Sequence, residues 1–402
     1  MPILSAVPFV ALLLAIAFLP LAAPAWWQQN RNKGIVVLVV STPILIYLGA
    51  RAPQLLAEKG LEYVRFIVVI SALFVVTGGI HIRGSLAGTP LVNTGVLGIG
   101  AVLANVLGTT GASVLLIRPL LRANKRREHV AHIVIFFIFI VANCAGVLTP
   151  IGDPPLLLGF LRGVPFTWTL RLWPQWLVVN GILLVVFYAW DRRVGKHEAV
   201  LVHEPLRIEG SVEILVLLGV IVTILAAPPG RTLIIAVLAL IGYFAGSADR
   251  RTQNAFTFTP LIEVTVLFAG LFATMAPVLE MMNHWTVVRT PAQFFWASGA
   301  LSSVLDNSPT YLAFAATAAG LQGVTPHGNY IGLIEPHILA AISTGSVFMG
   351  ANTYIGNAPN FMVRAIAEEH GVKMPSFFGY MVYSVGILGP LFIAVAVLFF
   401  AA

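Results

Sequence analysis

Long apolar runs follow one another along almost the whole chain, and they restrict its fold more than any other feature. A bilayer core accommodates about 20 helical residues, which rise roughly 1.5 Å each. Because 58% of the 402 residues are hydrophobic and only 10% are charged, a water-soluble globular protein is excluded. Eight runs suit a single crossing: Ile3–Ala25, Gly34–Ala50, Tyr63–Ile80, Trp173–Trp190, Ser211–Ala227, Thr232–Ala245, Ile262–Leu279 and Tyr380–Phe400.

Four further apolar runs do not fit a simple crossing. Leu91–Leu121 and Ala292–Gly320 are too long for one straight span and too short for two. Ala131–Leu161 and Ile338–Val363 carry Gly, Pro, Asn and Thr in their centres, which helix interiors normally avoid. A tilted or kinked helix explains any one of them. The alternative is a pair of re-entrant hairpins, at 91–121 and 292–320, and a pair of broken helices, at 131–161 and 338–363.

An internal repeat favours hairpins and broken helices. One motif recurs 204 residues further on, with Asp and Asn exchanged at one position: Gly146-x-x-Thr149-x-Ile151-Gly152-Asp153-x-Pro155 and Gly350-x-x-Thr353-x-Ile355-Gly356-Asn357-x-Pro359. Each copy follows an over-long run with a polar centre, at 108–113 and 305–310. Five crossings separate the two hairpins, and an odd number of crossings gives the second half the opposite orientation in the membrane. We therefore expect an all-α polytopic membrane protein with about ten transmembrane helices and two re-entrant hairpins in inverted-topology repeats.

This repeat predicts four parts of the chain. They are N-terminal helices at 1–60, a first repeat at 61–195, a cytoplasmic linker at 196–210 and a second repeat at 211–402. Sixteen Lys and Arg fall on one side of the predicted membrane and seven on the other. Because basic residues gather on the cytoplasmic side, we expect a multi-pass protein of a bacterial-type inner (plasma) membrane, with both termini outside.

The net charge of +7 does not indicate nucleic acid as a partner, because the basic residues lie in short loops between apolar runs. The lone Cys144 excludes a disulfide framework and a Cys-based metal cluster.

The polar centres place oxygen atoms at membrane depth. Interrupted backbone is tolerated there only where it is buried in protein or lines a wet cavity, and it leaves free carbonyl and N–H groups for small ions. Neutral oxygens beside one carboxylate suit an alkali cation better than a soft metal. These centres therefore indicate sites for hard cations.

Two carboxylates lie in the polar centres, Asp153 in the first half and Asp306 in the second. Burying an acid costs several kcal/mol unless it binds a cation or takes up a proton. Each could therefore exchange H⁺ for a metal ion. The alternatives are a helix cap near the surface for Asp153 and a cap at a hairpin tip for Asp306. The polar centres contain no Lys or Arg, which argues against a free di- or tricarboxylate ligand, although helix N-termini and bound cations could offset the repulsion.

Three segments, GTTGASVLLIRPLLRAN, LTPIGDPPLLLGFLRGVPF and SSVLDNSPTY, resemble the NhaD-type sodium/proton antiporters and the neighbouring citrate-transporter-like proteins of the ion transporter superfamily. The resemblance covers the chain from about residue 60 to its end. It implies a scaffold set of helices and an often dimeric, elevator-like transport set of two hairpins and two broken helices. The dicarboxylate branch has Ser-Asn-Thr at both hairpin tips. Here the tips read Gly108-Thr109-Thr110 and Asp306-Asn307-Ser308, which favours the cation-exchanging branch.

Carried over residue by residue, the resemblance implies two Na⁺ sites, in which Asp153 and Asp306 exchange cation and proton. The first site would use Thr109, Thr110, Ser113, Thr149 and Asp153. The second would use Asp306, Asn307, Ser308, Thr353 and Asn357.

The implied function is secondary active transport, most simply Na⁺(Li⁺)/H⁺ antiport. The alternative is cation-coupled transport of citrate, a dicarboxylate or a metal–citrate complex. A membrane-embedded prenyl or phosphoryl transferase is disfavoured, because the single acids are split between two inverted halves. We expect no enzyme activity, no catalytic residues and no cofactor apart from the transported Na⁺ and H⁺. The expected partners are small ions, citrate in the alternative, the lipid bilayer and a second copy of the chain.

Overall fold

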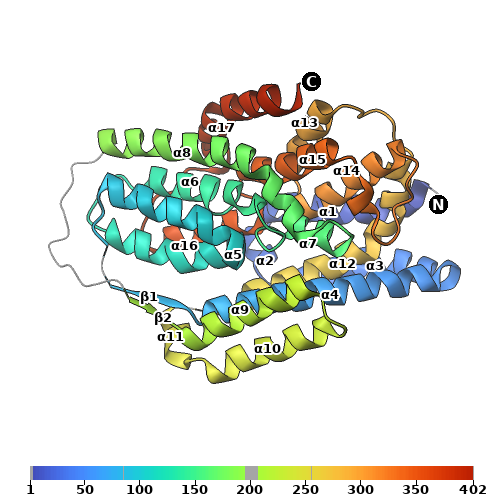
Figure 1. The fold of residues 1–402 in the computed structure, drawn as a ribbon, viewed down its shortest axis with the longest axis horizontal. Helices are drawn as coiled ribbons and strands as arrows, with labels where there is room; N and C mark the ends of the chain where they lie inside the picture. The colour runs from blue at the N-terminus through green and yellow to red at the C-terminus, as the bar shows by residue number, and fades with distance from the viewer. Residues whose placement is uncertain (1–2, 85, 195–206, 255, 402) are drawn as a thin grey trace.

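The computed structural model describes residues 3–84, 86–194, 207–254 and 256–401. Almost all of this part is helical, and most helices run along the long axis of the molecule (Figure 1). Shorter apolar helices accompany six that are long and apolar enough to cross a membrane: Asn30–Arg51, Pro53–Gly78, Pro90–Ala123, Phe166–Val194, Thr259–Asn283 and Phe377–Phe400. The predicted all-α polytopic membrane fold is confirmed.

One set of helices, which we call the support group, comprises the lower layer of Figure 1 and the N-terminal helices behind that layer. Within it α12 packs against α3 and α4, and α10 packs against α4 and α9. Its members are η1 (Ile3–Ala6), α1 (Val7–Ala22), α2 (Pro24–Trp27), α3 (Asn30–Arg51), α4 (Pro53–Gly78), α9 (Ser211–Ala226), α10 (Arg231–Ala245), α11 (Ala248–Gln253) and α12 (Thr259–Asn283).

The other set, the hairpin group, contains every interrupted helix. It meets the support group where α4 contacts α5 and α7, and where α12 contacts α14. Its members are α5 (Pro90–Ala123), α6 (Ala131–Ile140), η2 (Cys144–Val147), α7 (Pro154–Leu161), η3 (Phe166–Leu172), α8 (Trp173–Val194), α13 (Pro291–Ser302), α14 (Asn307–Leu321), η4 (Tyr330–Leu333), α15 (Pro336–Met349), η5 (Gly350–Asn352), α16 (Ala358–Glu369) and α17 (Phe377–Phe400).

The long helix α5 is a hairpin of two arms. Its backbone breaks at Gly108, whose φ of 76° and ψ of 157° suit glycine and few other residues. The arms return to the same side, because Asn93 near the start and Asn124 after the end exchange hydrogen bonds of 3.0 and 2.8 Å. Two buried amides thereby hold the base of the hairpin together.

A second hairpin consists of α13 and α14. Its arms touch through Phe294 and Phe314, whose ring centroids lie 6.4 Å apart. This hairpin lies at the end of the molecule opposite the base of α5, which is on the side of the strands (Figure 1). The two hairpins therefore enter from opposite ends, and each is followed by a broken helix, α6–η2–α7 or α15–η5–α16.

Two glycines of the repeated motif allow the broken helices to turn back on themselves. A Cβ atom on Gly152 would collide with the carbonyl of Gly146, and a Cβ on Gly356 would lie 2.6 Å from the carbonyl oxygen of Gly350. The motif thus repeats because both loops need the same close backbone approach.

Most of the predicted linker at 196–210 lies outside the described residues, at 196–206. Its next three residues form β2 (Arg207–Glu209), which pairs antiparallel with β1 (His81–Arg83). Strands this short leave no readable alternation in the sequence, so the prediction did not include them. The two chain termini lie toward the end of the molecule opposite these strands (Figure 1).

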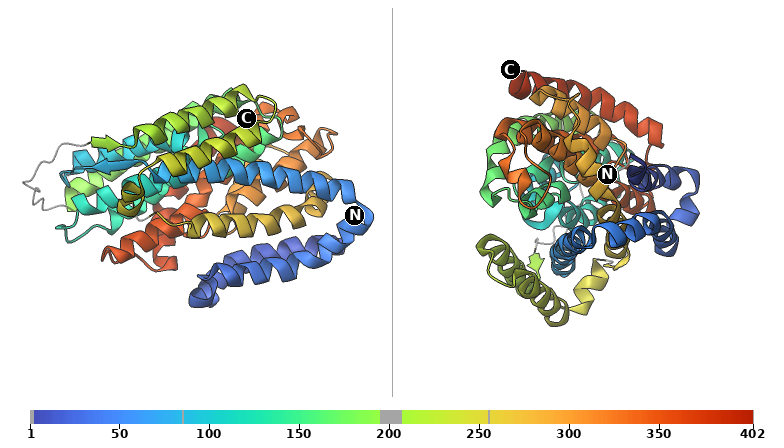
Figure 2. Two further views of the ribbon diagram at one scale, coloured as in Figure 1. Left: turned by 90° about the horizontal axis from the view of Figure 1, so that it is seen from below. Right: turned by 90° about the vertical axis from the view of Figure 1, so that its right-hand side faces the viewer.

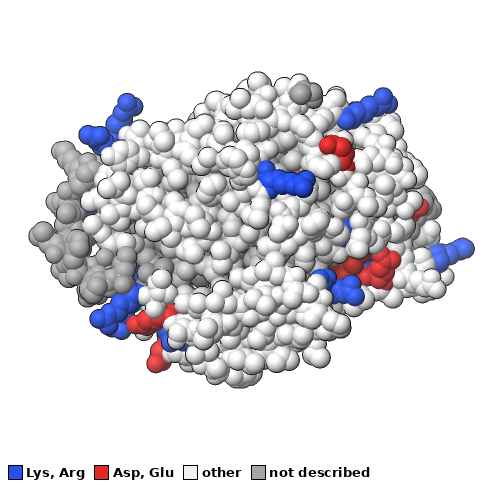
Figure 3. All heavy atoms as spheres, viewed as in Figure 1, with Lys and Arg blue, Asp and Glu red and all other residues white. Residues whose placement is uncertain are grey.

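Charged side chains on the face seen in Figure 3 gather mainly toward the two ends of the molecule. The area between them is largely uncharged, as the surface of a membrane-spanning protein should be.

Candidate ion-binding site

Asp153 lies where the two halves of the chain meet. Its side chain is 1% exposed and accepts hydrogen bonds at both oxygens. Thr109 Oγ1 donates to Oδ1 at 2.8 Å, and Asn357 Nδ2 donates to the same oxygen at 3.3 Å. Asn307 Nδ2 donates to Oδ2. The three donors come from α5 after its break and from the starts of α16 and α14. Asp153 itself precedes α7, so its carboxylate connects these four helices.

The burial of Asp153 contradicts the alternative of a cap near the surface. The residue does occupy the N-cap position of α7, but its side chain makes no capping hydrogen bond. Its oxygens accept instead from Thr109 of the same half and from Asn307 and Asn357 of the other half.

The hydrogen-bond donors to Asp153 are all neutral. Within the described ranges, no Lys, Arg or His forms an ion pair or hydrogen bond with this carboxylate. A buried, unneutralised carboxylate costs several kcal/mol, and either a proton or a bound cation removes that cost. The surroundings of Asp153 therefore suit a group that alternates between these two partners.

Helix ends surround this carboxylate. The second arm of α5, α7, α14 and α16 begin beside it, and the carbonyl of Ala142, just after the end of α6, accepts from the Asn357 amide that donates to the acid. An α-helix start carries about half a positive charge, and its end about half a negative one. The centre thus offers N–H groups to anionic oxygens and carbonyl groups to cations.

The predicted ligands Thr149 and Thr353 occupy equivalent positions. Thr149 Oγ1 donates to the carbonyl of Asn105 at 2.5 Å, and Thr353 Oγ1 donates to the carbonyl of Ser303 at 2.6 Å. The Thr353 hydroxyl also accepts from the backbone N–H groups of Ile355 and Gly356, at 3.3 and 3.1 Å. Each threonine thus ties a broken helix to the hairpin of its own half, and Thr353 has all its hydrogen-bonding capacity in use.

Asp306 is placed differently from Asp153. It is half-buried and caps α14, where its Oδ1 accepts from Ser308 N at 2.9 Å. The described hydrogen bonds connect it to Asp153 only through its neighbour Asn307, whose Oδ1 also lies 3.4 Å from Ser308 Oγ. Asp306 is thus the hairpin-tip cap that was the alternative interpretation of the sequence. Cation exchange at Asp306 stays a prediction.

Two more predicted ligands lie in the second arm of α5. Ser113 is fully buried, and its Oγ has no hydrogen-bond partner among the described residues. Thr110 is half-buried beside Thr109. Their roles as ligands stay predictions.

Two buried asparagines belong to the same network but were absent from the predicted set. Asn143 Nδ2 donates to Asn360 Oδ1 at 2.6 Å, and Asn143 Oδ1 accepts from Asn357 Nδ2 at 3.2 Å. Asn360 Nδ2 lies 2.9 Å from the carbonyls of Gly350 and Thr353. Asn143 lies in the interruption of the first broken helix, and Asn360 follows Asn357 by one helical turn. Both positions could have been recognised from the sequence.

The membrane-helical fold and the family match together indicate a multi-pass membrane transporter rather than an enzyme. The chain belongs to the family described as "putative citrate transport", whose model matches residues 1–400. The predicted likeness to citrate-transporter-like proteins is thereby confirmed, while the NhaD-type assignment stays a prediction.

A curated relative, the P protein of Homo sapiens, is 34% identical over 76 residues. These residues are 19% of this chain, and the chain spans only 9% of the length of that relative.

Proposed function

We propose that this protein is a secondary transporter that exchanges Na⁺ or Li⁺ for H⁺ at Asp153. One observation carries the proposal: the carboxylate is buried between the two halves, and its described partners are the neutral side chains of Thr109, Asn307 and Asn357. Such a group needs one positive charge at all times. Proton and cation therefore compete for it, and this competition couples the two fluxes.

The chemistry of the surroundings supports a hard cation. The hydroxyl oxygen of Thr109 contacts the acid, and the carbonyl oxygen of Ala142 accepts from the same Asn357 amide that donates to the acid; hydroxyl and carbonyl oxygens suit alkali ions. The hydroxyl of Ser113, on the α5 arm that begins at Thr109, has oxygen lone pairs to spare. Exchange then requires the hairpin group to shift against the support group, so that the site opens to one side at a time.

Flux in proteoliposomes that contain a pH-sensitive dye tests the proposal. Addition of Na⁺ or Li⁺ should collapse an imposed pH gradient, whereas Asp153→Asn should abolish this response. The matched control is Asp249→Asn, because Asp249 is an exposed acid in α11. Normal exchange by a correctly folded Asp153→Asn variant would remove Asp153 from the mechanism.

A second candidate function is cation-coupled citrate transport. The family description favours it, and so do the four helix starts around Asp153, since positive helix ends offset the lack of basic side chains there. Uptake of radiolabelled citrate that follows a Na⁺ or H⁺ gradient, without cation/proton exchange in the absence of citrate, would favour this function.

We also propose that the protein resides in a bacterial-type inner membrane with both termini outside. The distribution of Lys and Arg supports this orientation. Labelling of single cysteines added near each terminus, with a reagent that does not cross membranes, tests it in whole cells.

A further inference from the structure

A second buried polar cluster lies beyond the end of α7, where the hairpin group meets the support group. Arg162 follows α7 directly and is only 2% exposed. Its Nη2 donates to Oε2 of Glu62, on α4, at 2.6 Å. Its Nε and Nη1 are buried without a hydrogen-bond partner among the described residues. A guanidinium group therefore keeps most of its donors unused inside the protein.

Tyr330 brings another unused group to the same place. It lies in η4, is 2% exposed, and its hydroxyl also has no described partner. The short helix η4 packs on the end of α7, where Gly332 N donates to the carbonyl of Arg162 at 3.3 Å. The residues beside them also pack closely, because a Cβ on Gly163 would lie 2.7 Å from the Cβ of Asn329. Donors from two elements thus gather without an acceptor.

Arg162 shares its carboxylate with a second buried cation. Lys59 is 3% exposed, and its Nζ lies 3.0 Å from Glu62 Oε1. Two buried cations, Lys59 and Arg162, therefore share the carboxylate of Glu62, whose side chain is 17% exposed. A second acid, Glu58, lies 3.7 Å from Lys59, but its side chain is 42% exposed and solvent screens its charge. Lys59 therefore has two acids within 4 Å, whereas Arg162 has, among the described residues, only the carboxylate that it shares with Lys59.

We propose that Arg162 and Tyr330 bind a small monoanion, such as a carboxylate group or chloride, at this contact between α4, α7 and η4. A water molecule would satisfy the N–H and O–H donors. An anion would satisfy them and would also give the Arg162 guanidinium a negative partner of its own, which it lacks in the described part of the chain because it shares Glu62 with Lys59. The site is distinct from the Asp153 centre, because Arg162 is nine residues further along the chain, roughly 13 Å along a helix.

An anion at this position would also hold the two helix groups together. Glu62 belongs to the support group, while Arg162 and Tyr330 belong to the hairpin group. Binding should therefore stabilise the arrangement in which α4 and α7 are in contact, whichever ion Asp153 exchanges.

Thermal unfolding of the purified full chain in detergent, followed by tryptophan fluorescence, tests the site. Potassium acetate or chloride is titrated at constant pH and ionic strength against a bulky sulfonate, 2-(N-morpholino)ethanesulfonate. Either small anion should raise the Tm in a saturable way, and the more effective one identifies the source as a carboxylate or a halide. Tyr330→Phe should raise the half-saturating concentration about fivefold, which is the usual effect of one lost hydrogen bond. Arg162→Gln should abolish the response.

The matched control is Arg171→Gln, because Arg171 is an exposed arginine nine positions further on. It should respond as the unchanged protein does. Asp153→Asn should also keep the anion response, so failure of the anion site and failure of the exchange mechanism are distinguishable. No saturable rise in Tm, or the same rise in Arg162→Gln and Tyr330→Phe as in the unchanged protein, would overturn the proposal.

Discussion

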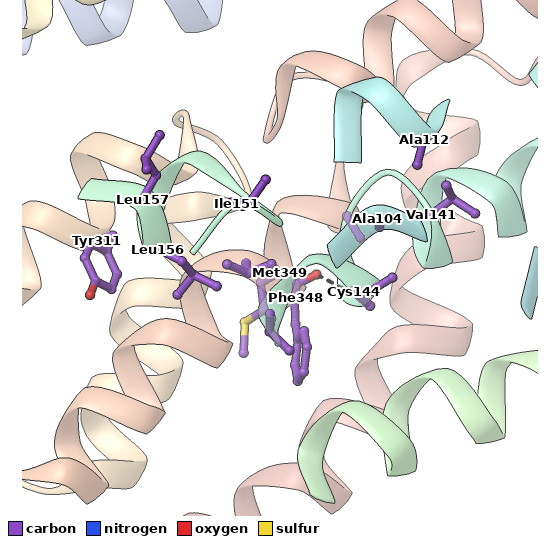
Figure 4. Close-up of a cluster of buried hydrophobic side chains, with 14 of the residues drawn as sticks. Ala104, Ala112, Val141, Cys144, Ile151, Leu156, Leu157, Tyr311, Phe348 and Met349 are labelled. Atoms are coloured by element: carbon purple, nitrogen blue, oxygen red, sulfur yellow. Dashed lines mark hydrogen bonds between the residues drawn. The ribbon is translucent and has the colours of Figure 1, made fainter. Parts of the chain in front are cut away.

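Asn357 donates a hydrogen bond of 3.3 Å to Asp153, the residue at the equivalent position of the other half. These positions are 204 residues apart in the sequence. Cys144 and Phe348 have the same spacing and also meet, with Sγ 3.9 Å from the carbonyl oxygen (Figure 4). The two halves thus bring the same loop to one centre, but only one copy carries a charge. The two copies of the motif therefore provide a single carboxylate with an amide as its partner.

Exchanging the acid and the amide between the halves tests this relationship. Asp153→Asn removes the exchangeable charge, and we expect Na⁺/H⁺ exchange to fall to background. Adding Asn357→Asp restores one acid within hydrogen-bonding distance of the original position. The double variant should therefore exchange at least about tenfold faster than Asp153→Asn, a difference of ~1.4 kcal/mol. Flux in proteoliposomes measures both, and equal rates would show that the two positions are not interchangeable.

Removal of one donor to Asp153 should weaken cation binding. Thr109→Val keeps the shape of the side chain but loses the 2.8 Å hydrogen bond to the carboxylate. A hydrogen bond to a charged group contributes about 1.5–3 kcal/mol, so the KM for Na⁺ should rise by about tenfold or more. The lost donor stabilised the ionised form, and the pH profile of exchange should therefore move to more alkaline pH.

The control for this substitution is Thr94→Val. Thr94 lies in the same helix, but its hydroxyl only donates to the carbonyl of Pro90. A KM and a pH profile that change equally in both variants would mean that the effect comes from the helix and not from the site.

The base of the first hairpin depends on another buried acid. Asp191, which is fully buried, ion-pairs with Arg127 and accepts from His132 at 2.8 Å and from Asn93 at 2.9 Å. Asp191→Asn leaves a buried cation unpaired, which should cost about 3–5 kcal/mol of stability. Arg364→Gln breaks a partly exposed pair with Glu368 and a cation–π contact with Tyr354, and should cost at most about 2 kcal/mol. Thermal unfolding compares the two, and similar losses would contradict a stabilising role for Asp191.

The backbone turn of each motif should tolerate no added methyl group. In Gly152→Ala the new Cβ meets the carbonyl of Gly146, and the loop that holds Asp153 must move. We expect a loss of about 1–3 kcal/mol in stability and a loss of exchange. Gly181→Ala in α8 is the control, because a Cβ there has no neighbour within 4 Å and alanine favours the helix. Normal exchange in Gly152→Ala would show that the close approach is dispensable.

The helical membrane fold could be predicted because it depends on local properties. An apolar run of about 20 residues lies in lipid, where the backbone must satisfy its own hydrogen bonds by forming a helix. Each run can therefore be recognised without knowledge of the rest of the chain. The same holds for the interruptions, since Gly, Pro, Asn and Thr disfavour helix wherever they occur. Strands β1 and β2 escaped prediction because each is only three residues long and their pairing joins His81 to Glu209.

The candidate site could be predicted only as a set of residues. The sequence contained Asp153 and Asp306 as apparent equivalents, yet Asp153 is bound by both halves and Asp306 caps its own helix. Thr149 and Thr353 looked like ligands, and their hydroxyls hold hairpins in place. Residue type alone does not distinguish these roles, because a hydroxyl or carboxylate serves a cap and an ion equally well.

By itself, therefore, the sequence determined that the chain is helical, lies in a membrane and carries one helix-interrupting motif twice. Tertiary structure alone decided which acid lies between the two halves and that Arg162 is buried against Glu62. The physical reason is distance along the chain. Asp153 is 154 residues from Asn307 and 204 from Asn357, and only packing of the whole molecule brings such side chains within hydrogen-bonding distance.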